Sequence, residues 1–142
     1  MYVARPSFDG CADFVQGFDS AWAGGLLFGF REWLIVKVDG ASNFAWPGLV
    51  VLLARKSGHP EFDPTEEKPE NVVFLFDTLE TFLAERKSID GPRTIFHRYD
   101  DWLGNQEWYH SGSPHWVPRQ ADLAKKPRST QARQGLSKKP TQ

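Results

Sequence analysis

Apolar residues at steps of three and four predict a helix near the start of the chain. The recurring positions are Cys11, Phe14, Val15, Phe18, Ala21 and Trp22. This spacing places side chains on one face of a helix. Asp9 is placed to cap the helix, and the Gly24-Gly25 pair breaks the pattern. The sequence therefore predicts an amphipathic helix whose core-facing stripe consists of these apolar residues.

The same spacing predicts a second helix directly after the two glycines. Its apolar positions are Leu26, Leu27, Phe30, Trp33, Leu34 and Val38, and the charged residues Arg31, Glu32 and Lys37 lie off the stripe. Asp39-Gly40 is a turn dipeptide and ends this helix.

The segment 43–56 allows two interpretations. Asn43 can cap a helix, and Pro47 lies where a first-turn proline is tolerated. Residues 49–54, however, are all apolar and short enough for a buried strand. We favour a buried helix because strong strand patterns are absent elsewhere. The residues that follow, 57–70, contain three prolines and five acidic residues and predict an exposed acidic loop.

Two further helices are predicted in the second half of the chain. The first begins at Asn71 and ends at Arg86-Lys87, with an apolar face of Val72, Leu75, Phe76, Leu79, Phe82 and Leu83 and an opposite face of Asp77, Glu80 and Glu85. The second begins at Asp90-Gly91-Pro92 and ends at Gly104-Asn105, with a stripe of Ile95, Phe96, Tyr99, Trp102 and Leu103. Residues 106–118 show no regular pattern and contain two tryptophans.

Together these patterns predict an all-α bundle of four to five helices, followed by an irregular tryptophan-containing segment. An α+β domain with 49–54 as a strand is the alternative. A length of 142 residues is typical of one domain with a substantial core.

The formal net charge of −1 conceals two segments of opposite charge. Residues 1–118 contain 10 basic and 17 acidic residues and all 20 aromatic residues. Residues 119–142 contain 7 basic residues and one acidic residue. Because segments of low hydrophobicity and high charge cannot offset the entropy of folding, we predict a globular domain over 1–118 and a disordered basic tail over 119–142.

Composition also bears on location. The single cysteine cannot form an internal disulfide and is typical of a reducing compartment. No signal-peptide pattern is present, and no apolar run approaches the about 18 residues that a membrane span needs. We therefore expect a cytoplasmic protein that does not associate with membranes.

Four polar residues toward the C-terminal side form the best candidate for an enzyme or metal site. His97 and Asp101 are four residues apart in a predicted helix, and His110 and His115 follow. These residue types can bind zinc or act as acid and base. The spacing is nonspecific, however, and His97 and Asp101 fall opposite the apolar stripe. We expect no metal, cofactor or catalytic residue, and whether the four side chains converge stays open.

Cys11 and the glycines are better explained by structure than by chemistry. Cys11 lies on the apolar stripe of the first predicted helix, where a small buried residue is expected. The GGLLFG segment at 24–29 lacks the spacing of a phosphate-binding loop.

The six tryptophans divide into two groups. Trp22, Trp33 and Trp102 fit helical stripes and are predicted to lie in the core. Trp46, Trp108 and Trp116 fall in turns or irregular segments and are predicted to be partly exposed. Exposed aromatics beside acids are typical of protein interfaces, but amphipathic rings also attach loops to a bundle.

The protein resembles the immunity proteins of bacterial toxin systems, which are also small, acidic and without a catalytic motif. The resemblance implies a non-enzymatic protein that binds and neutralises a basic toxin or nuclease. It is one of size and charge, and it carries over no site residue. From the charge pattern itself we predict an interface made of Glu61, Asp63, Glu66, Glu67, Glu70, Asp100, Asp101, Trp108, Tyr109 and Trp116.

Two alternative functions remain. One is a small enzyme or metalloprotein that uses the His/Asp residues of 97–115. The other is a regulator that binds nucleic acid through the basic tail, since Lys and Arg neutralise phosphates. That tail contains no aromatic residue for base stacking.

Overall fold

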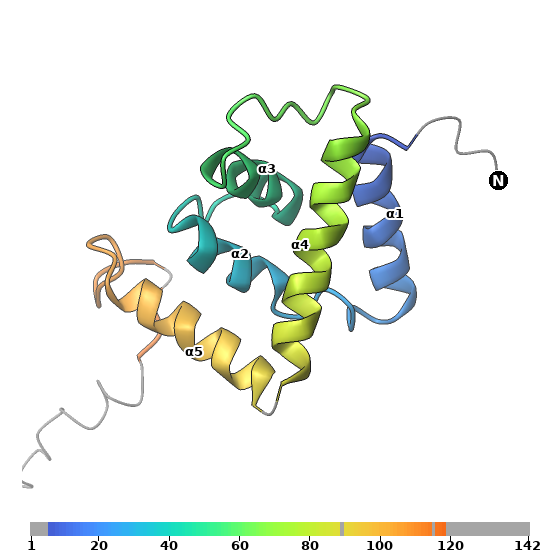
Figure 1. Ribbon diagram of the computed structural model, residues 1–142. Helices are drawn as coiled ribbons and strands as arrows, with labels where there is room; N and C mark the ends of the chain where they lie inside the picture. Colours follow the sequence, from blue (N-terminus) through green and yellow to red (C-terminus); the bar gives the residue numbers. More distant parts are fainter. Residues whose placement is uncertain (1–5, 89, 115, 119–142) are drawn as a thin grey trace, which may run out of the picture. The chain divides into compact units, whose positions relative to one another are not determined.

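The computed structural model describes residues 6–88, 90–114 and 116–118. The chain divides into two units, Met1–Gln106 and Glu107–Gln142. The predicted tail, 119–142, lies outside the described residues. All five helices lie in the first unit, and the described residues contain no strand (Figure 1). The predicted all-α bundle is therefore confirmed.

The helices are α1 (Phe8–Ala21), α2 (Phe30–Val38), α3 (Trp46–Lys56), α4 (Pro69–Lys87) and α5 (Gly91–Gly104). The longest helix, α4, packs against each of the other four, and α2 also packs against α3 and α5 (Figure 1). None of the helices in the described part of the chain combines the length and apolar character needed to cross a membrane.

Residues 49–54 lie within α3, so the favoured helix is confirmed and the alternative strand is wrong. The helix begins at Trp46, with Pro47 in its first turn, where the missing N–H of proline costs no hydrogen bond. Ala45, rather than Asn43, occupies the N-cap position. α2 likewise begins at Phe30, later than the predicted start at Leu26.

α1 presents a different face to the core from the predicted one. Its buried residues are Phe8, Ala12, Val15 and Asp19. Ser7, rather than Asp9, caps the helix, with its hydroxyl accepting from the Gly10 N–H at 3.2 Å. The predicted stripe was therefore wrong for its aromatic members: Phe14, Phe18 and Trp22 are 62%, 43% and 69% exposed.

Two of the tryptophan predictions are also wrong. Trp22 is exposed rather than in the core, whereas Trp46 is only 8% exposed. Trp33 and Trp102 are buried and Trp108 is exposed, as predicted. Each buried indole N–H donates to a side chain of another segment: Trp33 to Glu85, Trp46 to Gln16 and Trp102 to Asp39. Burying a tryptophan requires such an acceptor, which periodicity does not reveal.

The turn between α4 and α5 is tight. A Cβ atom added at Gly91 would lie 2.4 Å from the Arg86 carbonyl oxygen and 2.6 Å from that of Glu85. Only glycine allows the start of α5 to lie this close to the end of α4.

Candidate functional site

Five of the seven acidic residues of the predicted interface gather at one end of the first unit. Four of them, Glu61, Asp63, Glu66 and Glu67, lie on the connection 57–68 between α3 and α4, and Glu70 lies in the first turn of α4 (Figure 1). Asp63 is half-buried and the other four are exposed. We call the segment 57–70 the acidic loop. Most of it is exposed, as predicted.

The backbone of the acidic loop is held from within by a buried side chain. Asn71 is 4% exposed, and its amide donates to the carbonyl oxygens of Asp63 at 2.7 Å and Glu66 at 3.1 Å. Asp63 adds a local turn by accepting from the Thr65 N–H at 2.9 Å and the Thr65 hydroxyl at 2.7 Å. The carboxylates are therefore displayed on a fixed backbone.

The loop is also attached to the core through one aromatic residue. Phe62 is buried, and its ring meets Phe8 of α1 edge-on with the centroids 5.6 Å apart. The guanidinium of Arg55 donates twice to the Phe62 carbonyl oxygen, at 3.1 Å each. The prediction of an exposed loop missed this anchor, because a single phenylalanine among acids and prolines shows no periodicity.

The electrostatics of the loop follow from these contacts. Hydrogen bonds from the Thr65 side chain and backbone lower the pKa of Asp63, and the nearby charges of Arg55 and Lys68 act in the same direction. The hydrogen bond and charge of Glu66, with the charges of Glu70 and Asp63, raise the pKa of Lys68. Both pKa changes favour the charged forms, the Asp63 carboxylate and the Lys68 ammonium.

An open cavity of about 600 Å³ lies between the acidic loop and the first turns of α4. The volume is within the range typical of ligand sites, about 300–1,000 Å³. Its lining consists of Gly58, His59, Pro60, Glu61, Phe62, Lys68, Glu70, Asn71 and Phe74. Phe74 meets the rings of both His59 and Phe62 edge-on, with centroids 5.5 and 5.8 Å apart, so the cavity combines aromatic walls with two carboxylates.

The other predicted interface residues lie elsewhere. Asp100 and Asp101 are exposed on α5, at the side of the first unit away from the acidic loop (Figure 1). Trp108, Tyr109 and Trp116 belong to the second unit, where the Val117 N–H donates to the Tyr109 hydroxyl at 3.1 Å. The structure thus brings the loop acids together but does not join Asp100 and Asp101 to them.

Sequence reasoning missed an exposed aromatic stripe on α1. Phe14, Phe18 and Trp22 follow one another at intervals of four, and the Phe18 and Trp22 rings stack with centroids 5.7 Å apart. The helix contains three aspartates and no basic residue. A second periodicity, Phe8-Ala12-Val15-Asp19, was present in the sequence, but the aspartate obscured it.

The predicted His/Asp candidates do not form a site in the described residues. His97, Asp101 and His110 are all exposed, and His115 lies outside the described residues. Among the described side chains, no group of three or more His, Cys, Asp and Glu residues is placed to hold a metal. Cys11 is half-buried at the edge of the core, and burial raises the pKa of its thiol. A raised pKa disfavours the thiolate that a nucleophile needs.

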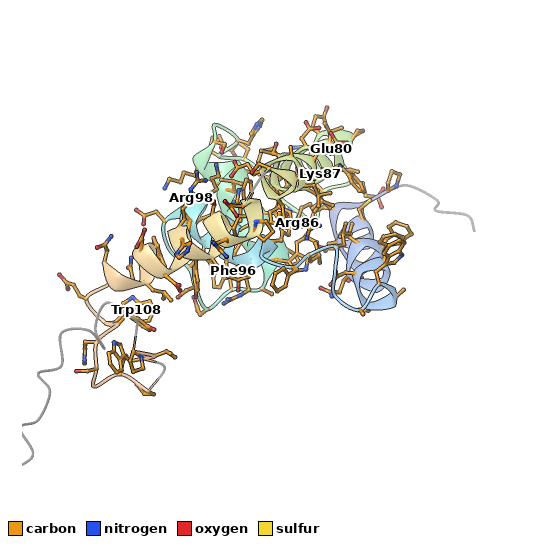
Figure 2. The ribbon with its side chains drawn as sticks, turned by 90° about the horizontal axis from the view of Figure 1, so that it is seen from below. Glu80, Arg86, Lys87, Phe96, Arg98 and Trp108 are labelled. Atoms are coloured by element: carbon orange, nitrogen blue, oxygen red, sulfur yellow. The ribbon has the colours of Figure 1, made fainter. Side chains whose placement is uncertain are left out.

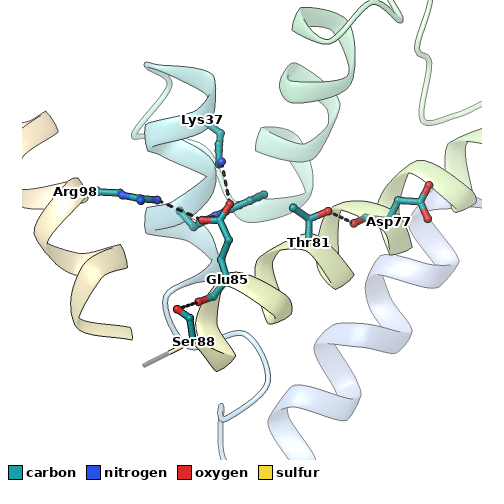
Figure 3. A network of polar contacts seen from close by, with 7 residues as sticks. Lys37, Asp77, Thr81, Glu85, Ser88 and Arg98 are labelled. Carbon is teal, nitrogen blue, oxygen red and sulfur yellow. Dashed lines mark hydrogen bonds and ion pairs between the residues drawn. The ribbon is translucent and has the colours of Figure 1, made fainter. Parts of the chain in front are cut away.

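Glu85 joins three helices and was wrongly placed on the solvent face by sequence reasoning (Figure 3). Its carboxylate accepts from Trp33 Nε1 at 2.9 Å and Lys37 Nζ at 3.1 Å, both on α2, and from Arg98 Nη1 of α5 at 3.4 Å. Burial by itself would raise the pKa of Glu85, but these hydrogen bonds and positive charges outweigh burial and lower it.

Three basic side chains lie toward the end of the first unit away from the acidic loop, where Figure 2 also labels the acid Glu80 and Arg98 pairs with Glu85. Figure 2 looks onto the end where α4 stops and α5 starts and shows Arg86, Lys87 and Arg98 there. Arg86 donates to the carbonyl oxygens of Gly25 and Leu26, at 2.9 and 2.7 Å, and so fixes the connection between α1 and α2. The negative charge of the body is therefore unevenly distributed.

Comparison of the chain with protein-family models, with characterised proteins and with solved structures gives no match.

Proposed function

We propose that this protein binds a basic protein partner and that the acidic loop is its main docking surface. The observation that carries the proposal is the set of five acidic residues held on a backbone that Asn71, Arg55 and Phe62 fix in place. A surface that is ordered before binding loses less conformational entropy in the complex. The loop can therefore use its charge for affinity and for rapid encounter.

Charge complementarity acts mainly on the rate of association and on specificity. The acidic loop contains five acids and one lysine, and that lysine pairs with Glu66. A cationic partner approaching this end of the unit is attracted, whereas the basic end near Lys87 repels it. The partner is thereby oriented during its approach.

Aromatic anchors are available on α1 as well. Hot spots of interfaces are enriched in tryptophan and other large rings, and contiguous exposed apolar patches mark interaction sites. The exposed aromatic stripe of α1 is such a patch and consists of Phe14, Phe18 and Trp22. Asp100, Asp101, Trp108, Tyr109 and Trp116 remain proposed as additional contacts.

The more specific form of the proposal is an immunity-type protein that acts in the cytoplasm. It would neutralise a basic toxin or nuclease by covering the cationic surface that such an enzyme uses on its substrate. The support is the likeness of size and charge together with the fixed acidic display. No catalytic role is needed for this function.

Affinity capture tests the proposal directly. The full chain is immobilised and exposed to extract of its source organism, and bound proteins are identified by mass spectrometry. We expect a basic protein whose purified form binds at a 1:1 ratio and, in the immunity form, loses its toxic or nuclease activity when bound. Absence of any basic binding protein contradicts the proposal.

Reversal of loop charges tests the docking surface. We expect Glu61→Lys, Glu67→Lys and Glu70→Lys together to slow association with the captured partner about tenfold at low ionic strength and to flatten its salt dependence. The matched control is Asp13→Lys, Asp77→Lys and Glu80→Lys, which changes net charge equally at exposed positions outside the loop. An unchanged rate for the loop variant shows that the partner docks elsewhere.

A further inference from the structure

The cavity beside the acidic loop has the chemistry of a receptor for a cationic side chain. Its walls include the rings of His59 and Phe74, and Glu61 and Glu70 bring two carboxylates to the same space. Lys68 is the only cation in the lining, and its ammonium is paired with Glu66. Aromatic walls with surplus negative charge suit a ligand that has an apolar stem and a positive head.

The floor of the cavity is built before any ligand arrives. Phe62 and Asn71 line it and are both buried, and Asn71 holds the loop backbone around it. The backbone of His59 is fixed by its main-chain N–H, which donates to the Ala54 carbonyl oxygen at 3.1 Å, and its ring lies against Phe74. The cavity therefore requires little ordering on binding.

Of the two natural cationic side chains, arginine fits this lining better. Its planar guanidinium stacks on aromatic rings, is weakly hydrated and donates in a fork to carboxylates. A lysine ammonium is compact and strongly hydrated, so it gains less from aromatic walls.

We propose that this cavity receives one arginine side chain of the basic partner, with its stem and the face of its guanidinium against Phe74 and His59 and its guanidinium N–H groups donating to Glu61 and Glu70. The inference rests on the proposed function and names the residue type that anchors the partner. It assigns the cavity a role in specificity, whereas the remaining loop acids act through long-range attraction.

A peptide titration tests the cavity without the partner. Acetyl-Gly-Arg-Gly-amide is added to the isotope-labelled full chain, and backbone amide shifts are followed by NMR. We expect saturable shifts confined to the cavity-lining residues, weaker shifts with the lysine peptide and none with the citrulline peptide, which has the same shape without the charge. Equal shifts with citrulline, or no shifts at these residues, overturn the proposal.

Two matched double variants separate the cavity from the general charge of the loop. Glu61→Gln with Glu70→Gln removes both lining carboxylates, whereas Glu67→Gln with Glu80→Gln removes the same charge outside the lining. We expect the first to weaken peptide binding about three- to tenfold and the second less than about twofold. Equal weakening overturns the cavity site but leaves the charge attraction of the proposed function intact. Failure to find a basic partner, in contrast, contradicts the proposed function whatever the peptide does.

A final variant identifies the source of the arginine. Arg119→Gln, Arg128→Gln and Arg133→Gln are introduced together into the full chain, and its spectrum is recorded without peptide. Unchanged cavity amides support an arginine from the partner. Shifts at those amides show that the chain's own C-terminal segment occupies the cavity and overturn the assignment to a partner.

Discussion

Single polar side chains determine how the helices of the first unit are joined. Glu85 links α4 to α2 and α5, Asn71 holds the acidic loop, and Asp19 accepts from the Leu27 N–H at 2.8 Å to fix the connection after α1. Removing one partner of such a contact costs free energy of unfolding mainly because the other partner is left buried without a hydrogen bond. Substitutions at these positions therefore have effects larger than their exposure suggests.

Glu85→Gln tests the ion-pair network through its pH dependence. The pKa of Glu85 is lower in the folded state than in the unfolded chain, so its ionised form stabilises the fold above the unfolded value. That contribution disappears as the pH falls through the folded pKa. We expect the variant to lose about 1 kcal/mol at neutral pH and to approach the wild type in acid, as the pH falls below the ordinary pKa of a glutamate and through the lowered folded value.

Urea unfolding at a series of pH values measures this difference. Glu80→Gln is the matched control, because Glu80 is an exposed acid on the same helix (Figure 2). If the free energies of unfolding of the wild type and of Glu85→Gln change with pH in the same way, the ionised Glu85 network does not contribute to the pH dependence of stability.

Asn71→Ala tests the support of the acidic loop. Removing the amide leaves the carbonyl oxygens of Asp63 and Glu66 without these donors, at a cost of about 1–3 kcal/mol. We expect faster hydrogen exchange at the Glu66 and Lys68 amides, whose acceptors are those two carbonyls. Thr78→Ala, at another buried polar position of α4, provides the control. Equal exchange rates in the two variants mean that Asn71 does not hold the loop.

At the scale of elements, α1 is the helix whose two faces are least expected. Its buried face contains an aspartate, and its exposed face contains Phe14 and Phe18, which Trp22 extends at the C-cap. Both faces obey helical periodicity, so the choice between them depends on the packing of α1 on α4. The exposed stripe is therefore available for contacts outside the first unit without any rearrangement of the core.

Two phenylalanine substitutions on α1 distinguish its faces. Phe8→Ala removes a fully buried ring and is expected to cost about 3–5 kcal/mol. Phe14→Ser changes an exposed ring, and because serine and phenylalanine have similar helix propensity, we expect a change within about 0.5 kcal/mol. Thermal and urea unfolding measure both. A large loss for Phe14→Ser shows that this ring packs against the fold.

At the scale of the whole molecule, charge is separated along the chain as well as across the first unit. The acidic loop lies at one end, Arg86 and Lys87 lie at the other, and residues 119–142 add seven basic residues in sequence. A charged partner is steered by the electric field summed over all charges of the protein. Because the charges are separated, the net charge of −1 understates the attraction that the acidic loop exerts on a cation nearby.

Neutralising the C-terminal charges tests this view. Replacing all seven basic residues of 119–142 by glutamine in the full chain changes the formal net charge from −1 to −8. We expect faster association with the captured basic partner at low salt, an unchanged dissociation rate, and no difference at about 0.5 M salt, where the field is screened. Stopped-flow fluorescence measures both rates. Slower association shows instead that these residues contact the partner.

Much of the fold was predictable from local pattern. The spacing of apolar residues located four of the five helices, whereas 49–54 fitted a helix or a buried strand equally well by pattern. Pro47 marked the start of α3 and Asp39-Gly40 the end of α2, because proline and glycine act through their own backbone geometry. The loop acids could be predicted to lie together because they are within ten residues of one another.

Other features depended on contacts between residues distant in sequence. The sequence by itself determined the approximate positions of four helices and that one connection is acidic. Only the tertiary structure decided that α1 turns its aromatic stripe outward, that Trp46 is buried against Gln16, and that Phe62 lines an open cavity beside the acidic loop. The physical reason is that periodicity defines the faces of a helix, whereas burial is decided by which face finds both apolar neighbours and partners for its polar atoms.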